Sequence, residues 1–113
     1  MKLVDKKITL KELKDLAEEK FGNLIKAVVD VEKGVMVVDA ELHSDEEAQL
    51  LSQGSKQENL WGINLYPDLK GEDFIEFDSM INLRPSFGNS SRGVDDPKIK
   101  EKIVEVVEKL IGK

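Results

Sequence analysis

The sequence contains no cysteine and only one histidine, one tryptophan and one tyrosine among its 113 residues. Without a thiol, the chain can form no disulfide, thiolate nucleophile, cysteine-ligated zinc site or iron–sulfur cluster. No apolar run approaches the roughly 18 residues that a membrane-spanning helix needs, and the first residues lack the apolar core of a signal peptide. We therefore expect a cytoplasmic protein without a membrane segment.

Positive charge is also in short supply. Seventeen basic residues stand against 23 acidic ones, which gives a net charge of −6 at pH 7. Nucleic acid is not an expected partner, because binding a phosphate backbone needs a basic surface. Charged residues make up 35% of the chain, and lysine and glutamate far outnumber glutamine and asparagine. This composition resembles that of thermophilic proteins.

The length and the hydrophobic periodicity predict one globular domain over residues 1–113. The predicted elements are a strand at 3–4, a helix over 10–21, a hairpin over 24–42, a helix from Ser44 to Gly54, strands over 59–66 and 73–84, and a helix from Pro97. This β-α-β-β-α-β-β-α order predicts an α+β fold, with a mostly antiparallel sheet and helices packed on one of its faces.

Each predicted helix begins with a capping signal. Thr9 precedes Glu12, and Ser44 precedes Glu47, at the spacing of a capping box. In such a box the hydroxyl accepts the amide hydrogen three residues later. Asp96 stands before a proline, which fits the first position of a helix. The sequence therefore predicts where the helices start.

Both arginines of the chain bracket one loop, over residues 84–93. A guanidinium holds a carboxylate or phosphate through two parallel hydrogen bonds, and the glycines, serines and asparagine between them would add further donors. The sequence thus predicts a small binding module that receives a small anionic ligand here. The candidate ligand-binding residues are Arg84, Asn89, Ser90, Ser91, Arg92 and Gly93. The alternative is local ion pairing, of Arg84 with Glu76 or Asp78 and of Arg92 with Asp95 or Asp96.

A second set of polar residues follows the predicted strands. Alternation places Glu41 and His43 on one strand face, and Glu76 and Asp78 on one face of the strand over 73–84. If those strands were neighbours, these four side chains would suit acid–base catalysis or a divalent metal. The alternative is an ordinary solvated sheet face. With one histidine and no cysteine, we expect no metal and no other cofactor.

Apolar side chains also occur on the nominally exposed sheet face. Tyr66, Phe74 and Met80 fall opposite Trp61, with Val28 and Leu60 as possible neighbours. An apolar stripe on a polar sheet is typical of a protein interface. These residues predict a homo-oligomer, and a non-catalytic interaction domain is the corresponding alternative function.

Two segments carry a resemblance to a known family. Residues 54–67 include Leu60-Trp61-Gly62-Ile63-Asn64-Leu65-Tyr66-Pro67, and residues 74–89 include Met80-Ile81-Asn82-Leu83-Arg84-Pro85 and Gly88-Asn89. With these motifs, the chain resembles a family of short bacterial and archaeal proteins catalogued as a domain of unknown function, nearly end to end. The resemblance implies a stand-alone protein and carries no activity, cofactor or catalytic residue.

Overall fold

A tight hairpin forms the centre of the sheet. In the computed structural model, which describes residues 1–112, β3 (Ile25–Asp30) runs antiparallel to β4 (Val35–Val38). Asp30 builds the turn between them, because its Oδ1 accepts the amide hydrogens of Glu32 and Lys33, each at 2.9 Å. The hairpin predicted over 24–42 is therefore confirmed.

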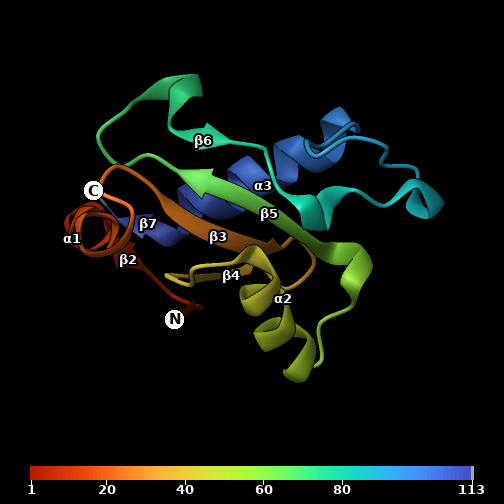
Figure 1. The fold of residues 1–113 in the computed structure, drawn as a ribbon, viewed down its shortest axis with the longest axis horizontal. Coiled ribbons are helices and arrows are strands. Elements are labelled where there is room, and N and C mark those ends of the chain that lie inside the picture. Colours follow the sequence, from red (N-terminus) through yellow and green to blue (C-terminus); the bar gives the residue numbers. More distant parts are fainter. Residues whose placement is uncertain (113) are drawn as a thin grey trace.

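The main sheet has five strands in the order β1-β4-β3-β5-β6. The outer strands are β1 (Lys2–Val4), which pairs with β4, and β6 (Ile75–Glu76), which pairs with β5 (Leu60–Leu65). Every pairing within this sheet is antiparallel. A separate parallel pair joins β2 (Ile8–Thr9) to β7 (Ile111–Gly112) near the chain ends (Figure 1).

Two of the three helices start at their predicted caps. Helix α1 (Leu10–Lys20) begins after Thr9, whose Oγ1 accepts the Glu12 amide hydrogen at 3.1 Å. Helix α3 (Pro97–Leu110) begins after Asp96, whose Oδ1 accepts the amide hydrogen of Lys98 at 2.9 Å. Both contacts satisfy amides that the helix leaves without a backbone acceptor.

The predicted capping box of the remaining helix is wrong. Helix α2 (His43–Ser52) has its N-cap two residues before Ser44, at Leu42, and no side-chain cap. Glu46 is fully buried, and its Oε2 accepts the amide hydrogen of Ala40 at 3.1 Å. The helix therefore starts where Glu46 can close the connection from β4, not where Ser44 would cap it.

The helices lie on both faces of the sheet. Helices α1 and α3 cover the face that carries Ala27, Val29, Met36, Ile63 and Leu65, and α3 runs behind β5 in Figure 1. Helix α2 covers the other face, where its Leu50 packs against Val28, Val37 and Leu60. The α+β class and the antiparallel sheet are confirmed, but the expectation of helices on one face alone is corrected. Three fully buried apolar side chains on the second face require a cover.

The strand predicted over 73–84 exists only as β6. After Glu76 the chain leaves the sheet and forms short 3-10 turns over Met80–Asn82 and Pro85–Phe87. Ser79 caps the first turn by accepting the Ile81 amide hydrogen at 3.3 Å. The apolar alternation in this segment mimics a strand, whereas its side chains close the edge of β5.

None of the helices within residues 1–112 is both long enough and apolar enough to cross a bilayer.

Candidate functional site

The face of the sheet that carries α2 has two unlike halves. We call the part beneath α2, formed by Val28, Val37 and Leu60, the covered half. The open half continues the same face with Lys26 of β3, Asn64 of β5 and Glu76 of β6. These three residues stand in register across neighbouring strands, Lys26 opposite Asn64 and Asn64 opposite Glu76. Because side chains alternate along a strand, Lys26 lies on the same face as Val28.

A cleft of about 220 Å³ lies where the open half meets the start of α2. Three parts of the chain that are distant in sequence line it: the β3–β5 ladder, the first turn of α2, and the segment after β6. The lining residues are Lys26, Leu42, His43, Ser44, Asn64, Asp78, Ser79, Met80, Ile81 and Arg92. His43, Asp78, Met80 and Arg92, four of the predicted site residues, therefore meet in one place.

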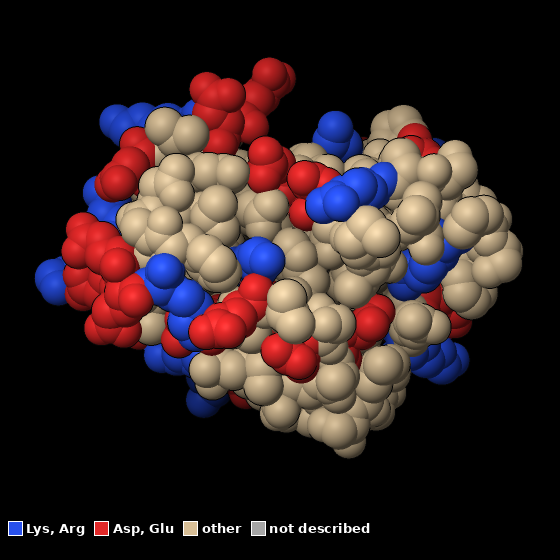
Figure 2. Space-filling view, in the orientation of Figure 1, with Lys and Arg blue, Asp and Glu red and all other residues tan. Residues whose placement is uncertain are grey.

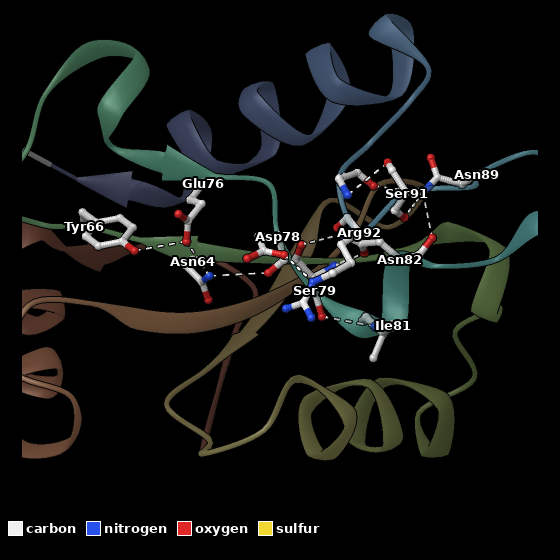
Figure 3. Close-up of polar contacts among 12 residues, drawn as sticks. Asn64, Tyr66, Glu76, Asp78, Ser79, Ile81, Asn82, Asn89, Ser91 and Arg92 are labelled. Carbon is white, nitrogen blue, oxygen red and sulfur yellow. Dashed lines mark hydrogen bonds and ion pairs between the residues drawn. The ribbon is translucent and has the colours of Figure 1, made fainter.

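A continuous chain of polar contacts borders this cleft (Figure 3). The Tyr66 hydroxyl donates to Glu76 Oε1 at 3.0 Å, and Asn64 Nδ2 donates to the same oxygen at 2.8 Å. Asn64 Nδ2 also approaches the Asp78 carbonyl at 3.4 Å, and Arg92 Nε donates to Asp78 Oδ1 at 2.7 Å. These contacts hold Asn64, Asp78 and Arg92 in fixed positions along β5.

His43 is held by the backbone of β5. Its Nε2 lies 2.8 Å from the carbonyl oxygen of Ile63. A carbonyl oxygen only accepts, so Nε2 carries a hydrogen and donates it. Nδ1 has no hydrogen-bond partner among residues 1–112, yet it is not one of the fully enclosed unpartnered atoms. Nδ1 is therefore the ring nitrogen that remains accessible.

The environment of His43 favours the neutral imidazole. Burial lowers its pKa most strongly, and the positive charge of Lys26 lowers it further. The Ile63 carbonyl, the Asn64 side chain and the Asp78 carboxylate act in the opposite direction, and the pKa stays below its usual value. The ring is consequently an uncharged acceptor near neutral pH.

Two cationic side chains, those of Lys26 and Arg92, line the cleft without full compensation. The Lys26 ammonium lies 5.3 Å from the centre of the Phe21 ring, and no carboxylate within residues 1–112 forms an ion pair with it. Arg92 engages Asp78 through Nε only, and its side chain is 55% exposed. Figure 2 shows charged groups crowded along the left side of the molecule, with red and blue groups separated by uncharged surface across its centre and right side.

Arg84 has a different role from Arg92. It is buried, and its guanidinium donates to the carbonyl oxygens of Gln57 and, at 2.7 Å, of Leu60. It also stacks on Trp61, with 4.4 Å from Cζ to the ring centre. Neither pairing expected for Arg84 from the sequence occurs, and it does not line the cleft. Both terminal nitrogens of Arg84 therefore donate to backbone carbonyl oxygens.

The rest of the predicted anion loop is hydrogen-bonded within itself. Asn89 is buried, and its Nδ2 donates to the carbonyl oxygens of Asn82, Ser91 and Gly93 at 2.7, 3.1 and 2.9 Å. The Ser90 amide and the Ser91 hydroxyl donate to Asp95 at 2.8 and 2.5 Å. Asp95 is thus engaged by serines and not by Arg92. Of the six predicted ligand-binding residues, only Arg92 reaches the cleft.

The predicted acid–base set is divided. Asp39 adopts a positive φ of 70° directly after β4, so Glu41 and His43 do not share a strand face as the alternation predicted. Glu41 is exposed and lines a separate, broad depression near Lys20 and Asp45, whereas His43 joins Asp78 in the cleft. Within the described part of the chain, no three histidine, aspartate or glutamate side chains cluster as a metal site requires.

The apolar patch predicted for an interface is rearranged. Val28 and Leu60 are fully buried beneath α2, and Phe74 packs against the core on the other face. Tyr66 is half-buried beside Glu76, while Met80 is 62% exposed at the rim of the cleft. The exposed face that motivated the oligomer prediction is therefore smaller than the alternation indicated.

Sequence reasoning missed Lys26 and Asn64 as site residues. Alternation placed Lys26 on the polar side of the hairpin, which is the correct face. The missing information was the register that sets it opposite Asn64. A lysine between Ile25 and Ala27 in an otherwise apolar strand was the available signal.

Comparisons with known proteins give one finding on identity. A family model described as "Protein of unknown function (DUF5674)" matches residues 2–110. A search of curated proteins and a search of solved structures each return no match. The family description assigns no chemistry, so functional inference rests on the geometry of the cleft.

Proposed function

The chain belongs to the DUF5674 family of proteins of unknown function, and we propose that it is a binding module whose cleft, between Lys26 and Arg92, receives the anionic group of a small molecule. The observation that carries the proposal is the charge of the cleft. Among the residues that line the cleft, Lys26 and Arg92 contribute two positive charges, Asp78 one negative charge, and His43 none. The Glu76 carboxylate lies outside this lining and accepts from Tyr66 and Asn64. A lining with more positive than negative charge, on a protein of charge −6, favours an anion at this position.

The position of Arg92 supports the proposal. Its backbone carbonyl accepts from the Ser79 amide at 3.0 Å and from Asn82 Nδ2 at 2.9 Å. Because Nε is held by Asp78, the two terminal nitrogens remain for a ligand, and a guanidinium edge can hold a carboxylate or phosphate through two hydrogen bonds. A side chain that is already held at one nitrogen loses less freedom when a ligand binds.

The anion site thus shifts from the whole 84–93 loop to its Arg92 end. Arg84 stabilises the backbone around β5, and the loop residues between the arginines hold their own turn. A cleft of about 220 Å³ fits a ligand of few atoms. We retain the cytoplasm, expected from the sequence, as the proposed setting.

Thermal unfolding in inorganic phosphate and in sulfate tests the proposal. Binding to the folded state alone stabilises it by ~2.7 kcal/mol at a hundredfold excess over the dissociation constant. We expect the melting temperature to rise with either anion and the rise to disappear in Arg92→Gln and Lys26→Met. Sodium chloride at equal ionic strength separates binding from screening.

Lys102→Gln provides the matched control, because it removes one charge from the exposed side of α3. It should keep the full anion response. An equal loss of response in Lys102→Gln and Arg92→Gln would show that only net charge matters, and the cleft would then not be the binding site.

A second candidate function is self-association through the exposed turns after β6. Met80, Leu83 and Phe87 are 62%, 42% and 59% exposed on this one segment. Exposed apolar groups that are close in sequence favour a protein contact. Light scattering at micromolar concentration should give twice the 12.7 kDa chain mass, and Phe87→Ser should return the monomer mass. A monomer in the wild type would contradict this candidate.

A further inference from the structure

His43 gives the cleft a hydrogen-bond acceptor that an anion alone does not use. The ring lines the cleft, and its Nε2 hydrogen is committed to the Ile63 carbonyl at 2.8 Å. In the neutral ring the other nitrogen, Nδ1, carries a lone pair and no hydrogen. A carboxylate oxygen, or a phosphate oxygen that carries no proton, is also an acceptor, so it cannot satisfy Nδ1.

The protein around Nδ1 leaves this lone pair available. Within residues 1–112, Nδ1 receives no hydrogen bond, and the neighbouring Asn64 side chain uses its Nδ2 on Glu76 and on the Asp78 carbonyl. Nδ1 is not fully enclosed by protein, whereas Asn64 Oδ1 is both enclosed and without a partner. A donor at Nδ1 must therefore come from the cleft, from water or from a bound molecule.

From this arrangement we infer that the ligand is a small hydroxylated anion, a hydroxycarboxylate or a hydroxyalkyl phosphate, whose hydroxyl donates to His43 Nδ1 while its anionic group meets Arg92 and Lys26. An ammonium group would also donate, but the two neighbouring cations repel it. The inference rests on the proposed anion site and adds the second group of the ligand.

Paired probes separate the two parts of this ligand. Glycerol 3-phosphate and propyl phosphate share the anion and differ in hydroxyl groups, and lactate and propionate form the corresponding carboxylate pair. One neutral hydrogen bond is worth about 5-fold in affinity. In an NMR titration at neutral pH, we expect glycerol 3-phosphate to bind about 5-fold more tightly than propyl phosphate, or lactate to exceed propionate by the same factor.

The substitution His43→Gln tests the acceptor directly. Glutamine can still donate to the Ile63 carbonyl, but its one acceptor is a carbonyl oxygen on a flexible chain in place of the fixed Nδ1 lone pair, so the preference for the hydroxylated probe should fall towards 1-fold. Binding of propyl phosphate should change less than about 2-fold. Ser44→Ala is the matched control, because Ser44 also lines the cleft and carries a hydroxyl of its own, and it should keep the preference.

A measurement on the wild type does not depend on how the variants fold. His43 is the single histidine of the chain, so its ring nitrogens give the only imidazole signals in a ¹⁵N spectrum. We expect a hydrogen on Nε2, none on Nδ1, and a shift of the Nδ1 signal with glycerol 3-phosphate that propyl phosphate does not produce.

The outcomes distinguish the two proposals. If all four probes fail to bind, the anion site is wrong and this inference falls with it. If neither pair shows a preference for its hydroxylated member and the Nδ1 signal stays in place, the anion site stands and the hydroxyl contact is overturned. Loss of the preference in Ser44→Ala, but not in His43→Gln, would assign the hydroxyl to Ser44 and also overturn it.

Discussion

The covered half and the open half of the α2 face use the same strands in opposite ways. In the covered half, Val28 and Leu60 are fully buried beneath α2, and Arg84 closes the strand edge beside them. In the open half, Lys26 and Arg92 border a cleft and keep donors for a ligand. Neighbouring positions on β3 and β5 therefore serve stability at one end and binding at the other.

The division has a physical reason. Apolar side chains gain most when they are removed from water, whereas an ammonium or guanidinium loses hydration when it is buried without a partner. Helix α2 therefore covers Val28 and Leu60 but leaves Lys26 at the cleft. Substitutions in the covered half should change the free energy of unfolding, and those in the open half should change ligand binding alone.

The largest effect is expected at the closed edge, from Arg84→Ala. This change leaves the carbonyl oxygens of Gln57 and Leu60 without donors and removes the stacking on Trp61. Each buried unpaired group costs about 1 to 3 kcal/mol. We expect the free energy of unfolding to fall by ~3 kcal/mol in urea denaturation.

Arg84→Lys should recover only part of this loss, because an ammonium cannot serve both carbonyls in the geometry of the planar fork. If Arg84→Ala has the same free energy of unfolding as the wild type, the claim that Arg84 stabilises the edge of β5 is wrong.

A smaller effect of opposite sign is expected within the covered half, from Glu46→Gln. Burial raises the pKa of Glu46 to about 9. The folded state therefore keeps a proton that the unfolded chain releases above its ordinary pKa of 4.5. Stability must then fall as pH rises from about 4.5 to about 9. Glutamine removes this dependence, and we expect it to stabilise the protein by ~2 kcal/mol at pH 8.

Urea denaturation at pH 4.5 and at pH 8 checks the sign. The advantage of Glu46→Gln should be smaller at the lower pH, where the carboxyl is protonated in the folded state and about half protonated in the unfolded chain. Glu101→Gln, at an exposed position on α3, is the control. Its stability difference from the wild type should be the same at both pH values. If the free energies of unfolding of Glu46→Gln and the wild type differed by the same amount at both pH values, Glu46 would not be protonated in the folded state.

The smallest effect is expected in the open half, from Arg92→Ala. The pair of Arg92 with Asp78 is close, at 2.7 Å, but the two side chains are 55% and 45% exposed. Exposed ion pairs contribute little, so the free energy of unfolding should change by less than about 0.5 kcal/mol. Chemical denaturation measures this without added anion. A loss as large as that of Arg84→Ala would make Arg92 a structural residue as well.

Local signals in the sequence predicted much of the fold. The hairpin of β3 and β4 follows from alternation, and Thr9 and Asp96 mark two helix starts by their own chemistry. The segment after β6 was mispredicted as strand, because Ile75, Phe77, Ser79 and Ile81 alternate as a strand would. Its true contacts are with residues of β5 about 20 positions away, and no local pattern contains them.

The candidate site was only partly predictable for the same reason. His43 and Asp78 were selected by residue type, and Arg92 by the scarcity of arginine, before any contact was known. Lys26 enters the cleft only through the pairing of β3 with β5. Arg84 and Arg92 have different roles because only Arg84 lies next to buried backbone carbonyl oxygens. That position is set by tertiary packing.

Asn82 also affects how this sheet meets other chains. Its side-chain amide accepts the Gly62 amide hydrogen at 2.8 Å and donates to the Gly62 carbonyl at 2.9 Å, as a peptide of a neighbouring strand would. Gly62 permits the approach, because a Cβ there would lie 2.6 Å from Ser79. With Arg84 on the Leu60 carbonyl, side chains occupy the edge of β5 beyond the two residues of β6. A strand from another molecule therefore finds no unpaired ladder there, which protects the protein against edge-to-edge aggregation.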